Sequence, residues 1–355
     1  MKHRKVESAP QAETVKKRKT HRVRTVILRV LAFLGVTLLC LCIGVYGLCF
    51  VVFCGPSAMA RDQLTLSMLG TSALKWVPEV YLPKETVDAI VAANEASVNT
   101  GVTDPSLVVI PKGDDPAVSG EWDDCPEGYR VEEVGSNNYH GWMIVVRDPS
   151  RLYVAAANDF SDPEAYGKKI GKIYEREKAA ILINASGFSD VGGHGKGGVP
   201  KGLTYAKGKR VYGDADKKYS GFVGITNDNV LVVGSMSAAK AEELGVRDGV
   251  SFGPVLVVNG EMQSFSAASG GLNPRTCIGQ RADGSILLLV LDGRQPGSVG
   301  ASYRDVAAIM ADYKAVNACN LDGGSSTVLM IDGELINHCC SLYGPRNLPT
   351  YFAIK

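Results

Sequence analysis

The sequence is poor in the side chains that most often build metal and nucleophile sites. Of its five histidines, only His140, His194 and His338 follow residue 53, and they form no H-E-x-x-H or H-x-H spacing. The sequence suggests no histidine partner for Ser325-Ser326 and so indicates no serine-hydrolase triad. These absences argue against a zinc enzyme and against a serine hydrolase. We therefore predict no cofactor and no metal site, and the sequence leaves a metal requirement open.

Cysteine supplies no framework either. Four of the nine cysteines lie in or beside one apolar segment, where they act as apolar filler, with lipidation of Cys54 as the alternative. The other five are an odd number with no C-x-x-C spacing: Cys125, Cys277, Cys319, Cys339 and Cys340. This pattern indicates neither a zinc site nor a disulfide scaffold. We expect at most two disulfides, with Cys277 and Cys319 as buried free thiols in strands.

The Gly-rich stretch SDVGGHGKGGVPKG lacks the features of a nucleotide-binding loop. Asp190 stands where a P-loop needs its first glycine, and Gly197 stands where it needs Ser or Thr after Lys196. A G-x-G-x-x-G reading places Pro200 at the third glycine. We interpret the stretch as a mobile loop that follows a strand, either functional or a passive connection. The sequence predicts no nucleic-acid partner.

Charge is missing from one long segment and unevenly distributed around it. Residues through Arg29 carry a formal charge of +8, which leaves −7 for the remainder of the chain. The next 24 residues, Val30 to Phe53, are uncharged and as a helix would measure about 36 Å, enough for a hydrocarbon core of roughly 30 Å. The basic flank predicts a single-pass cell-membrane anchor with a cytoplasmic tail (1–29) and an extracytoplasmic remainder. The alternative is a signal peptide cleaved at Ala58-Met59-Ala60.

The rest of the chain divides by composition. Residues 54–120 contain one helical pattern, Lys84 to Ala96, before a turn-rich stretch, and we interpret them as a juxtamembrane stalk or adaptor. From Trp122 onward short strands alternate with turn dipeptides, and helices are expected at about 163–178, 237–245 and 302–314. The strands ILLLVLDG and AILINASG are apolar on both faces, which is typical of sheet centres. We predict an α+β domain over 121–355, with mixed, largely antiparallel sheets and a few packed helices.

Polar residues follow several of these apolar strands. Asp292-Gly293-Arg294 follows 286–291, Asp322-Gly323-Gly324 follows 318–321, and Asn184 ends the strand at 180–184. Arg275 enters its strand directly after Pro274. Each has a purely structural reading, since Asp-Gly forms turns and an arginine can cap a sheet edge. The same residues at strand ends without a hairpin partner suit a site, in which a guanidinium binds a carboxylate or phosphate.

The ordered motifs SFGPVLVVNGE, NPRTCIGQRADGSILLLVLDGR, NLDGGSSTVLM and a late Arg-Asn-Leu-Pro resemble the phosphodiester glycosidase family from about Asp148 onward. The chain departs from the family pattern in three of its motifs. Asn184-Ala185-Ser186-Gly187-Phe188 replaces N-G-G-F-F, Cys277 replaces an alanine, and Ser325 replaces a glycine. The resemblance implies hydrolysis of an α-linked sugar 1-phosphodiester, of the N-acetylglucosamine type or in a cell-surface glycopolymer related to exopolysaccharide.

That reaction passes through an oxocarbenium-like transition state and releases a phosphate monoester. We predict Asp322 as the catalytic carboxylate, with Asp292 as the second choice. Arg275 with Arg294 behind it would hold the anion, and the amides of Gly323, Gly324 and Ser325 would form an anion-binding nest. Asn184 and Ser326 or Thr327 would contact sugar hydroxyls. Two alternatives stay open: a non-catalytic module that binds anionic glycopolymer, and a glycopolymer transferase.

Overall fold

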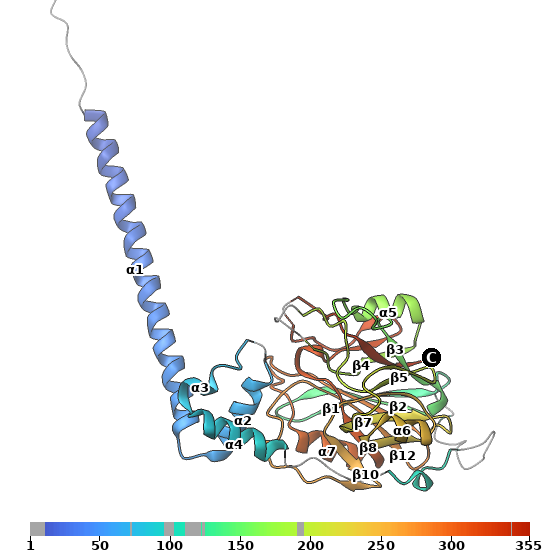
Figure 1. Cartoon of the computed structure of the whole chain (residues 1–355). Coiled ribbons are helices and arrows are strands. Elements are labelled where there is room, and N and C mark those ends of the chain that lie inside the picture. The colour runs from blue at the N-terminus through green and yellow to red at the C-terminus, as the bar shows by residue number, and fades with distance from the viewer. Residues whose placement is uncertain are drawn as a thin grey trace, which may run out of the picture. The chain divides into compact units, whose positions relative to one another are not determined.

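The structure is a computed structural model that describes residues 11–71, 73–95, 103–110, 122, 125–189, 195–341 and 343–355, with side chains described from residue 23 onward. The chain separates into two compact units, Met1–Pro56 and Ser57–Lys355. We describe each unit by itself (Figure 1).

The first unit is a single long helix, α1 (Gln11–Cys54). Its stretch Val23–Cys54 has 32 residues and a mean hydropathy of 2.7, which makes it long and apolar enough to cross a membrane. The predicted span at 30–53 lies within it. A signal sequence near the N-terminus can meet the same test of length and hydropathy, so insertion and orientation stay predictions.

The second unit begins with three short helices: α2 (Ala58–Leu69), α3 (Pro78–Tyr81) and α4 (Lys84–Glu95). The Ser57 side chain caps α2 by accepting from the amide of Ala60. The predicted domain boundary at residue 120 falls outside the described residues and stays a prediction. Helices α2, α3 and α4, which lie within the predicted stalk, belong to the same compact unit as the strands that follow.

The described strands form three sheets, and every pairing within them is antiparallel. The seven-stranded sheet has the order β1 (Tyr129–Gly135), β2 (His140–Val146), β13 (Ile286–Leu291), β12 (Arg275–Arg281), β14 (Ala315–Asn320), β10 (Val255–Val258), β11 (Glu261–Met262). A five-stranded sheet has the order β16 (Glu334–Leu335), β15 (Leu329–Ile331), β4 (Ile181–Asn184), β17 (Thr350–Ile354), β3 (Leu152–Ala156). The other five-stranded sheet has the order β6 (Lys209–Tyr212), β5 (Thr204–Ala206), β9 (Val246–Val250), β7 (Tyr219–Thr226), β8 (Leu231–Met236).

One face of each sheet contributes to a shared central core, and each opposite face packs against a helix. On β13, Ile286, Leu288 and Val290 enter the central core, whereas the alternate residues pack with α7 (Tyr303–Asp312). The sheet of β4 carries α5 (Ile170–Glu177) on its outer face, and the sheet of β7 carries α6 (Ala238–Glu243). The prediction that ILLLVLDG and AILINASG form covered sheet centres is confirmed, as is the α+β class.

The turn and cap signals of the sequence mark the observed element ends. Lys207-Gly208, Asn259-Gly260 and Asp332-Gly333 all have positive φ and join paired strands, as in two-residue hairpin turns. Ser302 and Asp305 form a capping box at the start of α7. The helix expected at 163–178 is shorter in the structure and begins only at Ile170, since Pro163 and Gly167 disfavour an earlier start.

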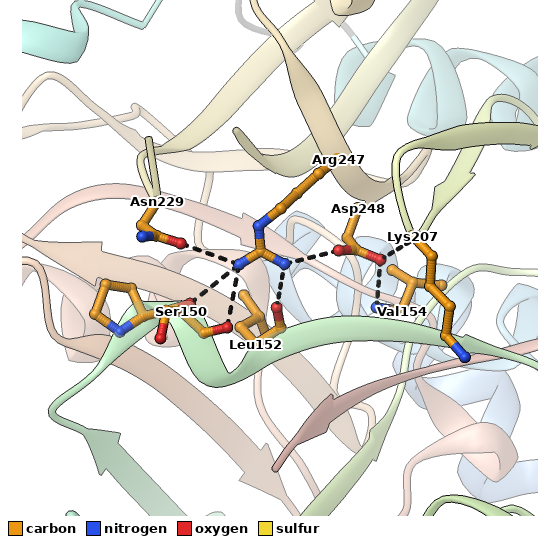
Figure 2. Close-up of polar contacts among 8 residues, drawn as sticks. Ser150, Leu152, Val154, Lys207, Asn229, Arg247 and Asp248 are labelled. Atoms are coloured by element: carbon orange, nitrogen blue, oxygen red, sulfur yellow. Dashed lines mark hydrogen bonds and ion pairs between the residues drawn. The ribbon is translucent and has the colours of Figure 1, made fainter. Parts of the chain in front are cut away.

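A buried ion pair joins β9 to the segment that leads into β3 (Figure 2). The Arg247 guanidinium donates to Asp248 Oδ2 at 2.8 Å, to the carbonyls of Pro149, Ser150 and Leu152, and to Asn229 Oδ1. Asp248 is 2% exposed, and its Oδ1 accepts from the amides of Val154 and Lys207. Both charges are therefore satisfied inside the protein, which is the condition for a tolerable buried pair.

Candidate functional site

The predicted site residues converge where three central strands of the seven-stranded sheet, β12, β13 and β14, have neighbouring ends. In the register of β12, Arg275 pairs with Leu291 at the end of β13, and Cys277 pairs with Asn320 at the end of β14. Because these strands are antiparallel, the start of β12 lies beside the ends of β13 and β14. Asp292 and Asp322 follow those two ends directly, so the antiparallel register gathers motifs that are distant in the sequence.

Asn184, at the end of β4, links its own sheet to these strand ends. Its Nδ2 donates to the carbonyl of Asp322, and its Oδ1 accepts from the Thr276 hydroxyl at 2.7 Å and the Val328 amide at 3.1 Å. The side chain is 0% exposed. The sequence predicted direct contact with a sugar hydroxyl, and the structure corrects this: the amide is enclosed by protein and holds the segment that carries Asp322.

Asp322 is a part-buried carboxyl with few stabilising partners. Gly323 donates its amide to Asp322 Oδ1 at 3.1 Å, and the Ser326 hydroxyl donates to the same carboxyl group. Burial raises its pKa from 3.8 to about 6, against the opposing effects of these hydrogen bonds and of the cations Arg346 and Lys201. A carboxyl that titrates near neutral pH can both accept and release a proton, which suits catalysis.

The residues after Asp322 form a short 3₁₀ turn, Gly324–Ser326. The predicted anion-binding nest is not free in the described conformation, because the Gly323 amide bonds to Asp322 and the Gly324 amide donates to the Pro274 carbonyl at 2.9 Å. Ser326 and Thr327 are both buried, and Ser326 bonds to the Asp322 carboxyl. Only Ser325 of this run has its hydroxyl engaged by a cation, since it accepts from Arg346 Nη1 at 3.1 Å.

Arg275 is 5% exposed and supports the site from behind. Its Nε donates to the Ala301 carbonyl at 2.8 Å, and its Nη2 donates to the carbonyls of Gly270 and Gly271. The guanidinium also lies 4.3 Å from the ring centre of Tyr303. These contacts differ from the predicted grip on an anion, because two of the hydrogen bonds hold the loop before Pro274 and the third goes to Ala301.

Arg294 lies closer to the turn that follows Asp322. It adopts a left-handed φ of 58° and donates from Nε and Nη2 to Asn273 Oδ1, and from Nη2 to the Gly70 carbonyl. A Cβ atom added to Gly324 would lie 3.1 Å from Arg294 Nη2. Burial lowers the pKa of this guanidinium, which still stays charged at neutral pH. Arg294 therefore places a positive charge against the turn that follows Asp322.

Asp292 has a supporting position. It is 4% exposed, and its two carboxylate oxygens accept from Asn337 Nδ2 at 3.1 Å and the His338 amide at 3.2 Å. Asn337 in turn accepts from the Leu329 amide, at the start of β15. This arrangement makes Asp292 a residue that fixes the segment behind the site, and it favours Asp322 over Asp292 as the carboxyl that meets a substrate.

Two cations near Asp322 were missed by sequence reasoning. Lys201 is exposed and lies in the loop after β4, where its amide donates to the Gly187 carbonyl. Arg346 comes from the Arg-Asn-Leu-Pro motif and lies 4.8 Å above the ring centre of Phe188, besides its bond to Ser325. The sequence pointed to Arg346 only as part of a motif of the family resemblance. No local pattern indicated Lys201, because long-range packing determines the position of its loop.

A cleft of about 1190 Å³ adjoins this group. Lys201 lines it and also acts on the Asp322 carboxyl, so cleft and carboxyl share that residue. Phe252 and Tyr303 contribute apolar walls, whereas Asn94 and Lys217 contribute polar ones. Its mixture of rings and polar donors is typical of a site for a polar organic molecule. Among the described residues, no group of three His, Cys, Asp or Glu side chains is placed to hold a metal ion.

The buried thiols are as the sequence predicted. Cys277 and Cys319 are both free and buried, and burial raises the pKa of Cys277 to about 12 and that of Cys319 still further. These thiols are therefore unreactive parts of the core. Cys340 is placed differently, because it bonds to Arg294 at the edge of the site.

This combination of fold and site agrees with comparisons to known proteins. The family described as "Phosphodiester glycosidase" matches residues 177–355, about half of the chain and all of the predicted site. The chain belongs to this family.

Individual relatives are distant. A 203-residue region is 29% identical to the SPbeta prophage-derived uncharacterized protein YomE of Bacillus subtilis and covers 54% of this chain but 29% of that protein. A 78-residue region is 32% identical to the Mus musculus N-acetylglucosamine-1-phosphodiester alpha-N-acetylglucosaminidase and covers 22% of this chain and 15% of that protein. This chain therefore spans under a third of the length of either relative.

The solved catalytic domain of the zebrafish N-acetylglucosamine-1-phosphodiester alpha-N-acetylglucosaminidase, auto-inhibited by its pro-peptide, superimposes with a TM-score of 0.54 at 20% identity. The match covers 64% of this chain and 81% of that one. At this identity the likeness supports the fold.

Proposed function

We propose that this protein is a membrane-anchored, extracytoplasmic glycosidase that hydrolyses an α-linked sugar 1-phosphodiester, with Asp322 as its central carboxylate. The family membership supports the reaction class. The observation that carries the proposal is the Asp322 carboxyl itself, whose pKa is raised to about 6 beside the cations Lys201 and Arg346. A carboxylate flanked by cations matches a substrate with an electron-poor ring and an anionic leaving group.

The chemistry divides between these groups. The bond from the anomeric carbon to the phosphate oxygen breaks, and its electron pair leaves with the phosphate. Above its pKa, ionised Asp322 stabilises the positive ring and takes the proton of the attacking water, whose hydroxyl joins the anomeric carbon. The products are a free sugar and a phosphate monoester. Because the leaving phosphate is already a weak base, the reaction needs no second carboxyl as a general acid.

Cations stabilise the departing phosphate in this scheme. Arg346 and Lys201 both act on the Asp322 carboxyl, Lys201 also lines the cleft, and Arg294 lies over Gly324. A guanidinium can give a phosphate two parallel hydrogen bonds, and a lysine supplies a mobile charge. We assign the phosphate to Arg346 and Lys201, in place of the Arg275 side chain that the sequence had suggested.

The cellular setting is the second part of the proposal. The apolar helix Val23–Cys54 follows a tail rich in Lys and Arg, so the positive-inside rule favours a cytoplasmic N-terminus and an exported domain. An exported domain would meet sugar phosphodiesters of a cell-surface glycopolymer. Labelling an engineered cysteine after Gly55 with a membrane-impermeant thiol reagent tests this topology, and protection of that cysteine in intact cells would contradict it.

One assay tests the reaction itself. The full chain in detergent is incubated in ¹⁸O-water with the methyl diester of N-acetyl-α-glucosamine 1-phosphate, and with a panel of other α-linked sugar phosphodiesters. We expect free sugar that carries the ¹⁸O, together with unlabelled phosphate monoester. Label in the phosphate, or release of sugar 1-phosphate, would contradict cleavage at the anomeric carbon. Saturable binding without product would favour the glycopolymer-binding alternative, and sugar transfer to an added acceptor would favour the transferase.

A further inference from the structure

The loop before Pro274 is held from both sides. Arg275 Nη2 donates to the carbonyls of Gly270 and Gly271 at 2.6 and 2.8 Å. From the opposite direction, Asn94 at the end of α4 accepts from the Gly270 amide at 2.7 Å. The loop on which the two site arginines converge is therefore also bonded to a helix that precedes the family-matched residues 177–355.

Helix α2 makes a second attachment to the same loop. The Ser67 hydroxyl oxygen accepts from the Leu272 amide at 2.8 Å. Gly271 has a φ of +59°, and a Cβ atom there would lie 2.6 Å from Ser67 Oγ and clash with the Ser67 backbone nitrogen. The helix thus packs directly against loop backbone, which a glycine alone permits. Next to it, the Gly70 carbonyl accepts from Arg294.

Asn94 differs from Ser67 because it also lines the cleft. Its Oδ1 is occupied by the Gly270 amide, which fixes the orientation of the side chain. The other end of the amide group carries two N–H donors. Across the same cleft lie the ring of Tyr303 and the cation Lys201, both of which belong to the surroundings of the site arginines and Asp322.

We infer that Asn94 is a specificity-determining residue that donates a hydrogen bond to an acceptor oxygen of the sugar phosphodiester, and that helix α4 holds it as a permanent part of the cleft lining. The inference rests on the proposed function and adds a residue that no family motif contains. It assigns the helices after α1 a role in substrate recognition as well as in connecting α1 to the strands.

The opposing reading is that these helices cover the site and restrain it. Two observations favour a fixed contribution to the cleft lining over a cover. Of the described side chains of α2, α3 and α4, Asn94 alone lines the cleft, and a volume of about 1190 Å³ stays open beside it. The helices also support Arg294 through Gly70, so their removal would displace a cation of the site.

The chain offers a matched pair of variants. Asn94→Ala and Ser67→Ala each remove one side-chain oxygen that accepts from an amide of the same loop, at 2.7 and 2.8 Å. Only Asn94→Ala also removes donors from the cleft. We would measure kcat, KM and thermal unfolding for the full chain in detergent, with the methyl diester of N-acetyl-α-glucosamine 1-phosphate as substrate, and Kd by calorimetry with the same compound.

We expect Asn94→Ala to raise KM about tenfold with kcat within twofold, as for one lost hydrogen bond to substrate. Ser67→Ala should leave KM within twofold, although both variants lower the unfolding temperature similarly. Equal KM changes in the two variants would mean that Asn94 has only a structural role. A kcat/KM for Asn94→Ala above that of the wild type would mean that the helices cover and restrain the site. If the wild type binds without turnover, the proposed function fails while the Kd ratio still decides this inference; with neither binding nor turnover, both fail.

Discussion

Two aspartates of the second unit, the buried Asp248 and the part-buried Asp322, have different hydrogen-bond environments and different roles. Asp248 receives an arginine and two backbone amides, so each oxygen of its carboxylate has a partner (Figure 2). Asp322 receives one amide and one hydroxyl, and burial raises its pKa to about 6. A fully paired carboxylate holds strands together, whereas an underpaired one keeps its reactivity at some expense of stability.

The largest expected effect is on turnover at Asp322. Asp322→Asn preserves the shape of the side chain but removes its charge and basicity, so kcat should fall by about 10²–10⁴-fold. Product release from a sugar phosphodiester measures the effect, and Asp292→Asn serves as the comparison. Full turnover in Asp322→Asn would mean that another residue is the catalytic carboxylate. The proposed difference in role between Asp322 and Asp248 would then be wrong.

The next effect is on stability at Asp248. Asp248→Ala leaves the Arg247 guanidinium buried without its carboxylate and leaves two amides without an acceptor. The free energy of unfolding should fall by about 3–5 kcal/mol. Denaturant titration measures this loss, and the folded fraction should keep its kcat. A change below about 1 kcal/mol would mean that water or other groups replace the pair.

A smaller effect is expected at the cation beside the site. Arg346→Ala removes the guanidinium that bonds to Ser325, and we expect kcat/KM to fall about 30-fold, or about 2 kcal/mol, as for a charge-assisted hydrogen bond. Lys240→Ala, on the exposed face of α6, is the matched control for a lost positive charge. Equal effects of the two variants would indicate general electrostatic attraction in place of specific phosphate binding.

The smallest expected effect is on the pH dependence of the free energy of unfolding at Asp322. Because the pKa of Asp322 is higher in the folded state, its ionised form destabilises the fold, and this penalty is complete above about pH 6 and absent below about pH 4. Asp322→Asn should therefore raise the free energy of unfolding by about 1–2 kcal/mol at pH 8, allowing for partial exposure. Unfolding at pH 4 should show no gain, and a gain that persists there would point to packing.

Much of the fold was predictable because its signals are local. Positive-φ turns at Lys207-Gly208 and Asp332-Gly333, and the capping box at Ser302, are encoded within a few residues. The assignment of β2 and β3 to different sheets was not predictable, although they are separated by one short turn. Sheet membership depends on pairing with β13 and β17, which lie far along the chain.

The sequence predicted which residues gather near the candidate site better than it predicted what each of them contacts. Motif order identified Asp322 and Arg294, but whether a polar atom faces substrate or protein depends on distant partners. Asn184 is the clearest case, since its acceptors and donors lie beyond residue 275. Lys201 escaped notice for the same reason: nothing within its own Gly-rich loop indicates that Asp322 lies nearby.

The place of β17 has a consequence for how the protein is made. Thr350–Ile354 insert between β3 and β4, so the sheet that holds Asn184 and steadies Asp322 is incomplete until this last strand has been synthesised. Earlier strands can form hairpins while the ribosome is still translating, but the candidate site assembles only afterwards.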